Sequence, residues 1–97
     1  MARRARTTPS AHKKSAAEHE RFHVIDGNTL GSIAELANAL DTMSDDAFYY
    51  HVGEQRNDFA TWVRDVFGEQ HLAAALMETT TREQALIAVL KHLLKMA

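Results

Sequence analysis

The fold is decided by the stretch Arg56-Asn57-Asp58-Phe59-Ala60-Thr61-Trp62-Val63-Arg64-Asp65-Val66-Phe67-Gly68, which has the clearest helical periodicity in the chain. At 100° per residue its large apolar side chains fall within about 140° of the helix circumference, which predicts one buried face. These side chains are Phe59, Trp62, Val63, Val66 and Phe67. Asn57 or Asp58 is expected to cap the start of this helix, and Gly68 to end it in the left-handed conformation.

Two shorter helices are expected before this segment. Ser32 followed by Glu35 forms a capping box, and apolar residues at helical spacing continue the pattern until about residues 41–43. Ser44 is the next N-cap, and the helix it begins covers about residues 45–52.

Two further helices are expected after it, over about residues 69–78 and from Thr80 or Thr81 to the end of the chain. The last helix has more apolar residues than one buried stripe requires. The stripe consists of Leu86, Val89, Leu90 and Leu93, and Ile87 and Leu94 extend its flank. Central burial of this helix is the default expectation, and a subunit contact through Ile87 and Leu94 is the alternative.

Order is expected to begin with a short β-branched and aromatic run at residues 21–25, closed by the turn signal at 26–28. One strand forms no sheet, so this run is expected to pack as an extended arm or to pair with another chain. The predicted fold class is all-α: about five short helices in a single domain over residues 21–97, preceded by that arm and by a disordered basic tail over residues 1–20.

Charge is divided unevenly along the chain. Residues 1–22 carry six cations and two carboxylates, a net +4, whereas the remainder carries five cations and eleven carboxylates, a net −6. A segment without periodic apolar residues cannot offset its ordering entropy, so the tail is expected to be disordered. Its first fourteen residues hold the cations that would contact phosphates or an acidic partner: Arg3, Arg4, Arg6, Lys13 and Lys14.

Composition excludes several classes of protein. The 97 residues are 45% hydrophobic and 25% charged, which is typical of one globular domain. The absence of Cys excludes disulfides and thiolate metal sites. No apolar run approaches the roughly 20 residues of a membrane span, so we expect no membrane association and a cytoplasmic location.

The chemically richest stretch joins the second and third expected helices. Its candidate residues are Tyr50, His51, Arg56, Asn57, Asp58 and Trp62. As a catalytic site it would use His51 as general base and Glu54 or Asp58 to orient the ring, but no nucleophile elbow accompanies them. The favoured interpretation is structural: Asn57 and Asp58 cap a helix, Arg56 pairs with a carboxylate, and His51 hydrogen-bonds near Trp62.

Metal and cofactor sites are not predicted. Six His are scattered through the chain without a zinc-type spacing, and the four Gly stand singly at the ends of elements rather than in a phosphate-binding loop.

The motif His51…Arg56-Asn57-Asp58-Phe59-Ala60-x-Trp62-Val63, together with Phe22-x-Val24-x-Asp26-Gly27 and Leu72-Ala73, resembles a family of small, largely archaeal prokaryotic proteins of unknown function. The resemblance covers about residues 22–93. It implies a single helical module and no catalytic role, and it marks His51, Asn57, Asp58 and Trp62 as the positions to test first.

The sequence therefore predicts a small non-enzymatic interaction module that binds a protein partner or itself, without cofactor or metal. The alternative is a nucleoid-type protein that binds nucleic acid weakly and without sequence specificity through its tail.

Overall fold

The computed structural model describes residues 15–96, which form five α-helices and one two-stranded hairpin. The helices are α1 (Ile33–Thr42), α2 (Asp45–His51), α3 (Asp58–Phe67), α4 (Gln70–Met77) and α5 (Arg82–Met96). The hairpin consists of β1 (Phe22–His23) and β2 (Thr29–Leu30), and the 3₁₀ helix η3 (Glu18–Glu20) precedes it. The predicted helical fold is confirmed in outline, with a small sheet in addition.

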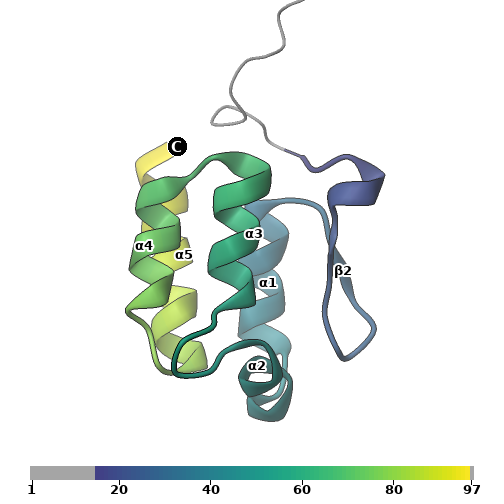
Figure 1. The fold of residues 1–97 in the computed structure, drawn as a ribbon. Coiled ribbons are helices and arrows are strands. Elements are labelled where there is room, and N and C mark those ends of the chain that lie inside the picture. The colour runs from purple at the N-terminus through teal and green to yellow at the C-terminus, as the bar shows by residue number, and fades with distance from the viewer. Residues whose placement is uncertain (1–14, 97) are drawn as a thin grey trace, which may run out of the picture.

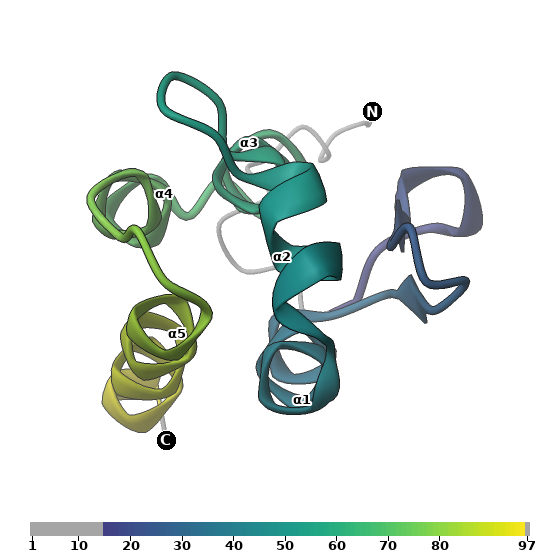
Figure 2. The ribbon, with the colours of Figure 1, turned by 90° about the horizontal axis from the view of Figure 1, so that it is seen from below.

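Four of the helices run side by side, and α2 crosses one end of the group (Figures 1 and 2). α1 packs against α5, α5 against α4, and α4 against α3. The hairpin lies beside α1 and α3, on the side of the molecule away from α4 (Figure 2).

One hydrophobic core joins all five helices. Its fully buried large side chains are Leu36 and Leu40 of α1, Phe48 of α2, Phe59, Val63 and Phe67 of α3, Leu76 of α4, and Val89 of α5. The face predicted for residues 59–67 is the one that α3 buries, with Val66 partly exposed.

The helix boundaries follow from capping residues visible in the sequence. Ser32 and Ser44 accept hydrogen bonds from backbone amides three residues ahead, as N-caps do. Asn57, rather than Asp58, caps α3, and Gly68 ends it with a φ of 68°. Thr81 Oγ1 accepts the amide of Gln84 at 3.1 Å, so the cap at Thr81 precedes α5.

The expected lone arm is instead one strand of a hairpin, so that prediction is wrong. Phe22 pairs with Leu30 and His23 with Thr29 in antiparallel register. The turn between them places Gly27 at a φ of 101°, a conformation that favours glycine. β2 is only two residues long, too short for a period-two pattern to reveal it.

The residues just before the hairpin also lie against the domain, although the sequence placed them in the tail. The Ala16 amide donates to the Gly31 carbonyl at 2.6 Å, and Ala16 is buried. The Glu20 carbonyl accepts a hydrogen bond from the Trp62 indole at 2.7 Å. The predicted tail cations, Arg3, Arg4, Arg6, Lys13 and Lys14, lie outside the described residues.

α5 lies at the edge of the helix group, so the default expectation of central burial is wrong (Figure 2). It buries Ala85 and Val89, and Leu86 and Leu93 are partly buried. The exposed fractions of Ile87, Leu90 and Leu94 are 52%, 44% and 76%. The flanking residues Ile87 and Leu94 therefore face outward, and so does Leu90, which was predicted to belong to the buried stripe.

Candidate functional site

The centre of the predicted cluster is His51, the last residue of α2, whose ring is buried. Its Nδ1 lies 3.0 Å from Asp58 Oδ2, in the first turn of α3. Its Nε2 accepts a hydrogen bond of 3.0 Å from the backbone amide of Ile25, which follows β1. One imidazole therefore joins the hairpin, α2 and α3.

These two contacts determine the tautomer of the ring. A backbone amide can only donate, so Nε2 must be the acceptor and carries no proton. The proton of the neutral ring is then on Nδ1, where it is donated to the Asp58 carboxylate. Both ring nitrogens are engaged, and neither has a lone pair available to take a proton from a substrate.

Arg56 belongs to the tight connection between α2 and α3. Val52 and Asn57 form an isolated antiparallel bridge, and the Gly53 amide donates to the Arg56 carbonyl at 2.7 Å. The guanidinium of Arg56 hydrogen-bonds the Tyr50 carbonyl, and its Nε lies 3.5 Å from Asp58 Oδ1. Arg56 thus pairs with a nearby carboxylate, as predicted, and its contacts link the end of α2 to the start of α3.

Asn57 is buried and uses both ends of its side-chain amide. Oδ1 accepts the Ala60 amide at 3.0 Å, which caps α3, and Nδ2 donates to the Leu76 carbonyl in the last turn of α4 at 3.0 Å. A buried amide with each end satisfied contributes to stability. The Leu76 carbonyl also accepts the Thr79 amide at 3.0 Å and the Thr79 hydroxyl at 2.7 Å, so Asn57 is not its only donor. Asn57 therefore ties the start of α3 to the end of α4.

Trp62 joins the cluster through Phe22 of the hairpin. The Phe22 ring stacks on Phe59 at 4.9 Å between centroids, and it meets His51 and Trp62 edge-on at 5.0 and 5.7 Å. The indole hydrogen-bonds the chain before the hairpin rather than His51. The Tyr50 ring lies 4.9 Å from His51 but is 55% exposed, so it covers the imidazole from the outside.

The six predicted residues are therefore brought together, and their contacts fasten the hairpin, the connection after α2 and the ends of α3 and α4. Among residues 15–96 no group of three or more His, Cys, Asp or Glu residues is placed to hold a metal ion. The hairpin residues Phe22 and Ile25 complete the cluster. The sequence placed both in the expected extended run, and Phe22 in the resemblance motif, but it did not assign them to this cluster, because the Ile25–His51 contact joins residues 26 apart.

A second candidate site is a groove of about 390 Å³ between α4 and α5. It is lined by His71, Leu72 and Ala75 from α4 and by Gln84, Ile87, Ala88, Lys91, His92 and Lys95 from α5. Of these residues the sequence singled out only Ile87 as a site residue. Two helices that contribute none of the six predicted cluster residues form the groove, and only their packing brings its walls together.

The groove differs in charge from the rest of the described surface. Residues 1–14 hold five of the eleven Lys and Arg residues and no Asp or Glu, so residues 15–97 carry six cations and all thirteen carboxylates. Two of those six cations, Lys91 and Lys95, line the groove, and no Asp or Glu is among its lining residues. The exposed Arg64 of α3 lies elsewhere, beside Asp65, whose hydrogen bond and negative charge raise the pKa of the Arg64 guanidinium.

No helix in the described part of the chain is both long enough and apolar enough to span a membrane. Comparison with known proteins shows the family: a family model described as "Family of unknown function (DUF5752)" matches residues 21–96. No curated protein and no solved structure matches the chain.

Proposed function

The chain belongs to this family of unknown function, DUF5752, and we propose that it is a non-enzymatic cytoplasmic interaction module that docks a protein through the outer face of α5. The observation that carries the proposal is the exposure of Ile87, Leu90 and Leu94 on that face, at 52%, 44% and 76%.

The three side chains form one stripe. At 100° per residue they lie within about 60° of the circumference of α5, opposite the buried Ala85 and Val89. Single exposed leucines are ordinary, but large apolar side chains that adjoin one another on a helix face are typical of interaction surfaces. Ile87 also lines the groove beside α4, so the stripe and the groove form one continuous surface.

The geometry of His51 supports a non-enzymatic role. Among the predicted cluster residues His51 was the candidate general base, and its Nε2 is occupied by the Ile25 amide. We therefore assign a structural role to the cluster and the binding function to the outer face of α5.

Site-specific photocrosslinking tests this proposal. A photoreactive amino acid replaces Leu94 in the full chain, expressed in its native cells, and the attached protein is identified by mass spectrometry. The matched position is Asp46, which is exposed on α2, away from the stripe. We expect one specific adduct from position 94, lost when Ile87→Glu is added, and none from position 46. Equal labelling from both positions, or no adduct from position 94, would contradict the proposal.

A second candidate function, nucleic-acid binding, is supported by the +4 charge of residues 1–22. The five cations at residues 3–14 suit contacts to phosphates, which give affinity without sequence specificity. The acidic body adds no comparable basic face, so this function is expected to reside in the tail alone.

A further inference from the structure

We propose that the groove between α4 and α5 binds an acidic amphipathic helix of a partner protein. This inference rests on the proposed function and names the chemistry of the partner. The shape of the groove, its charge and its relation to the exposed stripe each support it.

The groove has the shape that a helix requires. Its walls are two neighbouring helices, α4 and α5, joined by a short connection (Figure 1). Ala75 and Ala88 are among its lining residues, and such small side chains allow a third helix to approach closely. Leu72 lines the groove but is buried in the core, so the exposed apolar contact comes from Ile87. Helix-in-groove binding uses this arrangement, with apolar side chains inserted along one face of the bound helix.

The charge of the groove selects an acidic partner. Lys91 and Lys95 stand one helical turn apart on α5, and neither forms an ion pair with a described residue. His71 is exposed on the opposite wall. Two carboxylates one turn apart on a bound helix would face the two lysines at the same spacing.

His92 also lines the groove. Its Nε2 is buried and makes no hydrogen bond with a described residue, and the nearest carboxylate oxygen, Glu69 Oε1, is 3.8 Å away. Because Nε2 is buried, a bound helix does not reach it, and His92 contributes to the groove as a lining residue only.

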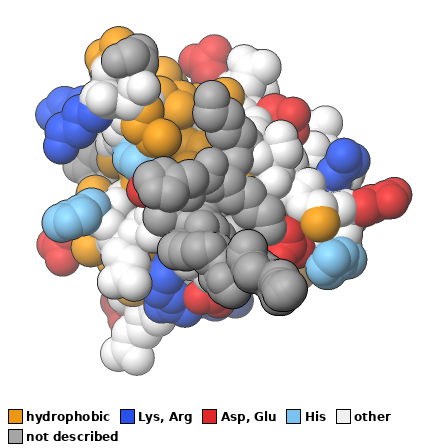
Figure 3. Space-filling model, turned by 90° about the horizontal axis from the view of Figure 1, so that it is seen from above, with side chains coloured by type: hydrophobic (Ala, Val, Ile, Leu, Met, Phe, Trp, Pro, Cys, Tyr) orange, Lys and Arg blue, Asp and Glu red, His pale blue; other side chains and the backbone are white. Residues whose placement is uncertain are grey.

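Viewed from the end at which α5 finishes, the surface combines the same two features. Hydrophobic side chains gather there, with histidine and with lysine or arginine side chains next to them (Figure 3). An amphipathic surface of this kind is complementary to a helix that is apolar on one face and acidic on its flanks.

A second copy of the chain is a poorer occupant. In a two-fold dimer the same patch meets itself, so Lys91 and Lys95 of both copies would enter one interface. Four like charges would then oppose the association that the apolar stripe favours. A separate acidic helix gains from the same lysines.

The test uses the full-length protein and two labelled synthetic peptides of about 16 residues, four helical turns. Both carry leucines along one helical face. The acidic peptide has glutamates on the flanks, and the basic peptide has lysines at the same positions. Binding is followed by fluorescence anisotropy at low and high salt. We expect saturable binding of the acidic peptide that weakens with salt, and at least tenfold weaker binding of the basic peptide.

Charge reversal then assigns the binding to the groove. Lys91→Glu should lower the affinity for the acidic peptide by about three- to tenfold, since an exposed attraction becomes a repulsion. It should raise the affinity for the basic peptide. Arg64→Glu changes the net charge equally but lies on α3 outside the groove, and it should alter neither affinity by more than about twofold. Circular dichroism confirms that both variants remain folded.

Three results would overturn the inference: no saturable binding up to about 1 mM protein, equal binding of both peptides, or equal losses in Lys91→Glu and Arg64→Glu. Crosslinking from position 94 to another copy of the chain would also overturn it, while leaving the docking role of α5 intact. Failure of the inference and failure of the proposed function are therefore distinguishable.

Discussion

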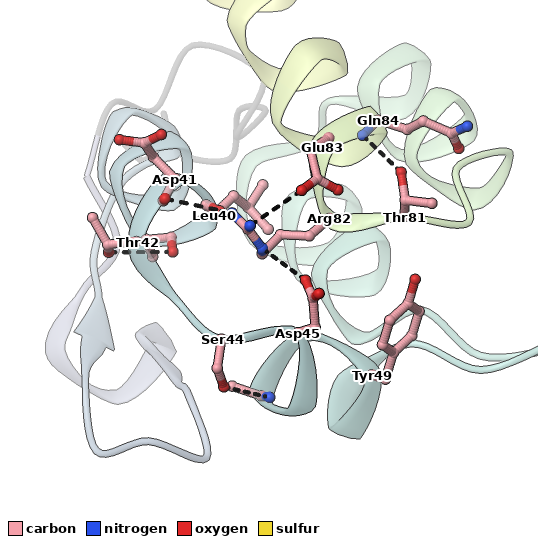
Figure 4. Close-up of polar contacts among 12 residues, drawn as sticks. Leu40, Asp41, Thr42, Ser44, Asp45, Tyr49, Thr81, Arg82, Glu83 and Gln84 are labelled. Atoms are coloured by element: carbon pink, nitrogen blue, oxygen red, sulfur yellow. Dashed lines mark hydrogen bonds and ion pairs between the residues drawn. The ribbon is translucent and has the colours of Figure 1, made fainter.

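Arg82, the first residue of α5, donates a hydrogen bond of 2.7 Å from Nη1 to the carbonyl oxygen of Leu40 in the last turn of α1 (Figure 4). Carbonyls at the end of a helix lack partners within it, so the guanidinium satisfies a group that would otherwise need water. Its Nε also lies 3.1 Å from Asp45 Oδ1 in the first turn of α2. One side chain, only 20% exposed, thus connects three helices.

We expect Arg82→Met to lower the free energy of unfolding by about 1–2 kcal/mol, because it keeps much of the aliphatic stem but removes the charged hydrogen bonds. Arg82→Lys should recover only part of this loss, since one ammonium cannot reproduce the fork of donors. Urea denaturation of both variants is the measurement, with Arg64→Met as the exposed control. Equal midpoints for all three would show that the contacts contribute nothing.

Asn57→Ala should lower the free energy of unfolding by about 2 kcal/mol. It removes an N-cap, which is usually worth about 1 kcal/mol, and the buried hydrogen bond from Nδ2 to the Leu76 carbonyl, which contributes about 1 kcal/mol more. Asp58→Ala should also lower the melting temperature, but by less, since Asp58 is partly exposed and is not the cap. Thermal denaturation compares the two. If both variants kept full stability while partner binding vanished, the cluster would be a binding site.

The geometry of His51 predicts the Nδ1–H tautomer, with Nε2 unprotonated. Long-range ¹⁵N–¹H correlation spectra of the imidazole distinguish the two tautomers directly. We expect the Nε2 resonance to have the shift of an acceptor nitrogen, and His51→Phe to destabilise the fold by leaving the Ile25 amide unpaired. A protonated Nε2 in the neutral ring would contradict this arrangement.

Leu94→Glu should leave the fold intact, because the side chain is 76% exposed. Its effect on the free energy of unfolding should stay within about 0.5 kcal/mol, whereas Val89→Glu places a charge in the core and should unfold the protein. Circular dichroism measures both. Light scattering on wild-type protein tests self-association: if it remains monomeric at high concentration, the alternative of a dimer through Ile87 and Leu94 is excluded.

Nucleic-acid binding, if the tail supplies it, should disappear when residues 1–14 are deleted. The deletion stops there because Ala16 and Glu20 contact the domain. Neutralising five phosphates predicts a slope of about −4.5 in log K against log salt for duplex DNA. Titration of both chains at several salt concentrations is the measurement. Binding retained by the shortened chain would exclude the tail as the source.

The sequence by itself determined the helices and their ends. Capping side chains act within one turn, so Ser32, Ser44 and Asn57 could be read from their spacing, and the buried face of α3 followed from its periodicity. The sequence also indicated that the residues from Tyr50 to Trp62 lie together, because they fall within thirteen consecutive positions. These are local effects, in which one short segment carries both partners of each interaction.

Tertiary structure decided what depends on distant partners. The pairing of β1 with β2 rests on two residues in each strand, too few for a pattern. Whether α5 lies at the centre or the edge depends on how much of its surface α1 and α4 cover. The same apolar residues on α5 are compatible with a buried core position or with an exposed stripe. The tautomer of His51 depends on a hydrogen bond from the Ile25 amide, 26 residues away in the sequence. The groove beside Lys91 forms only when α4 packs on α5. Contacts of this kind close long loops, and no local propensity specifies which loops will close.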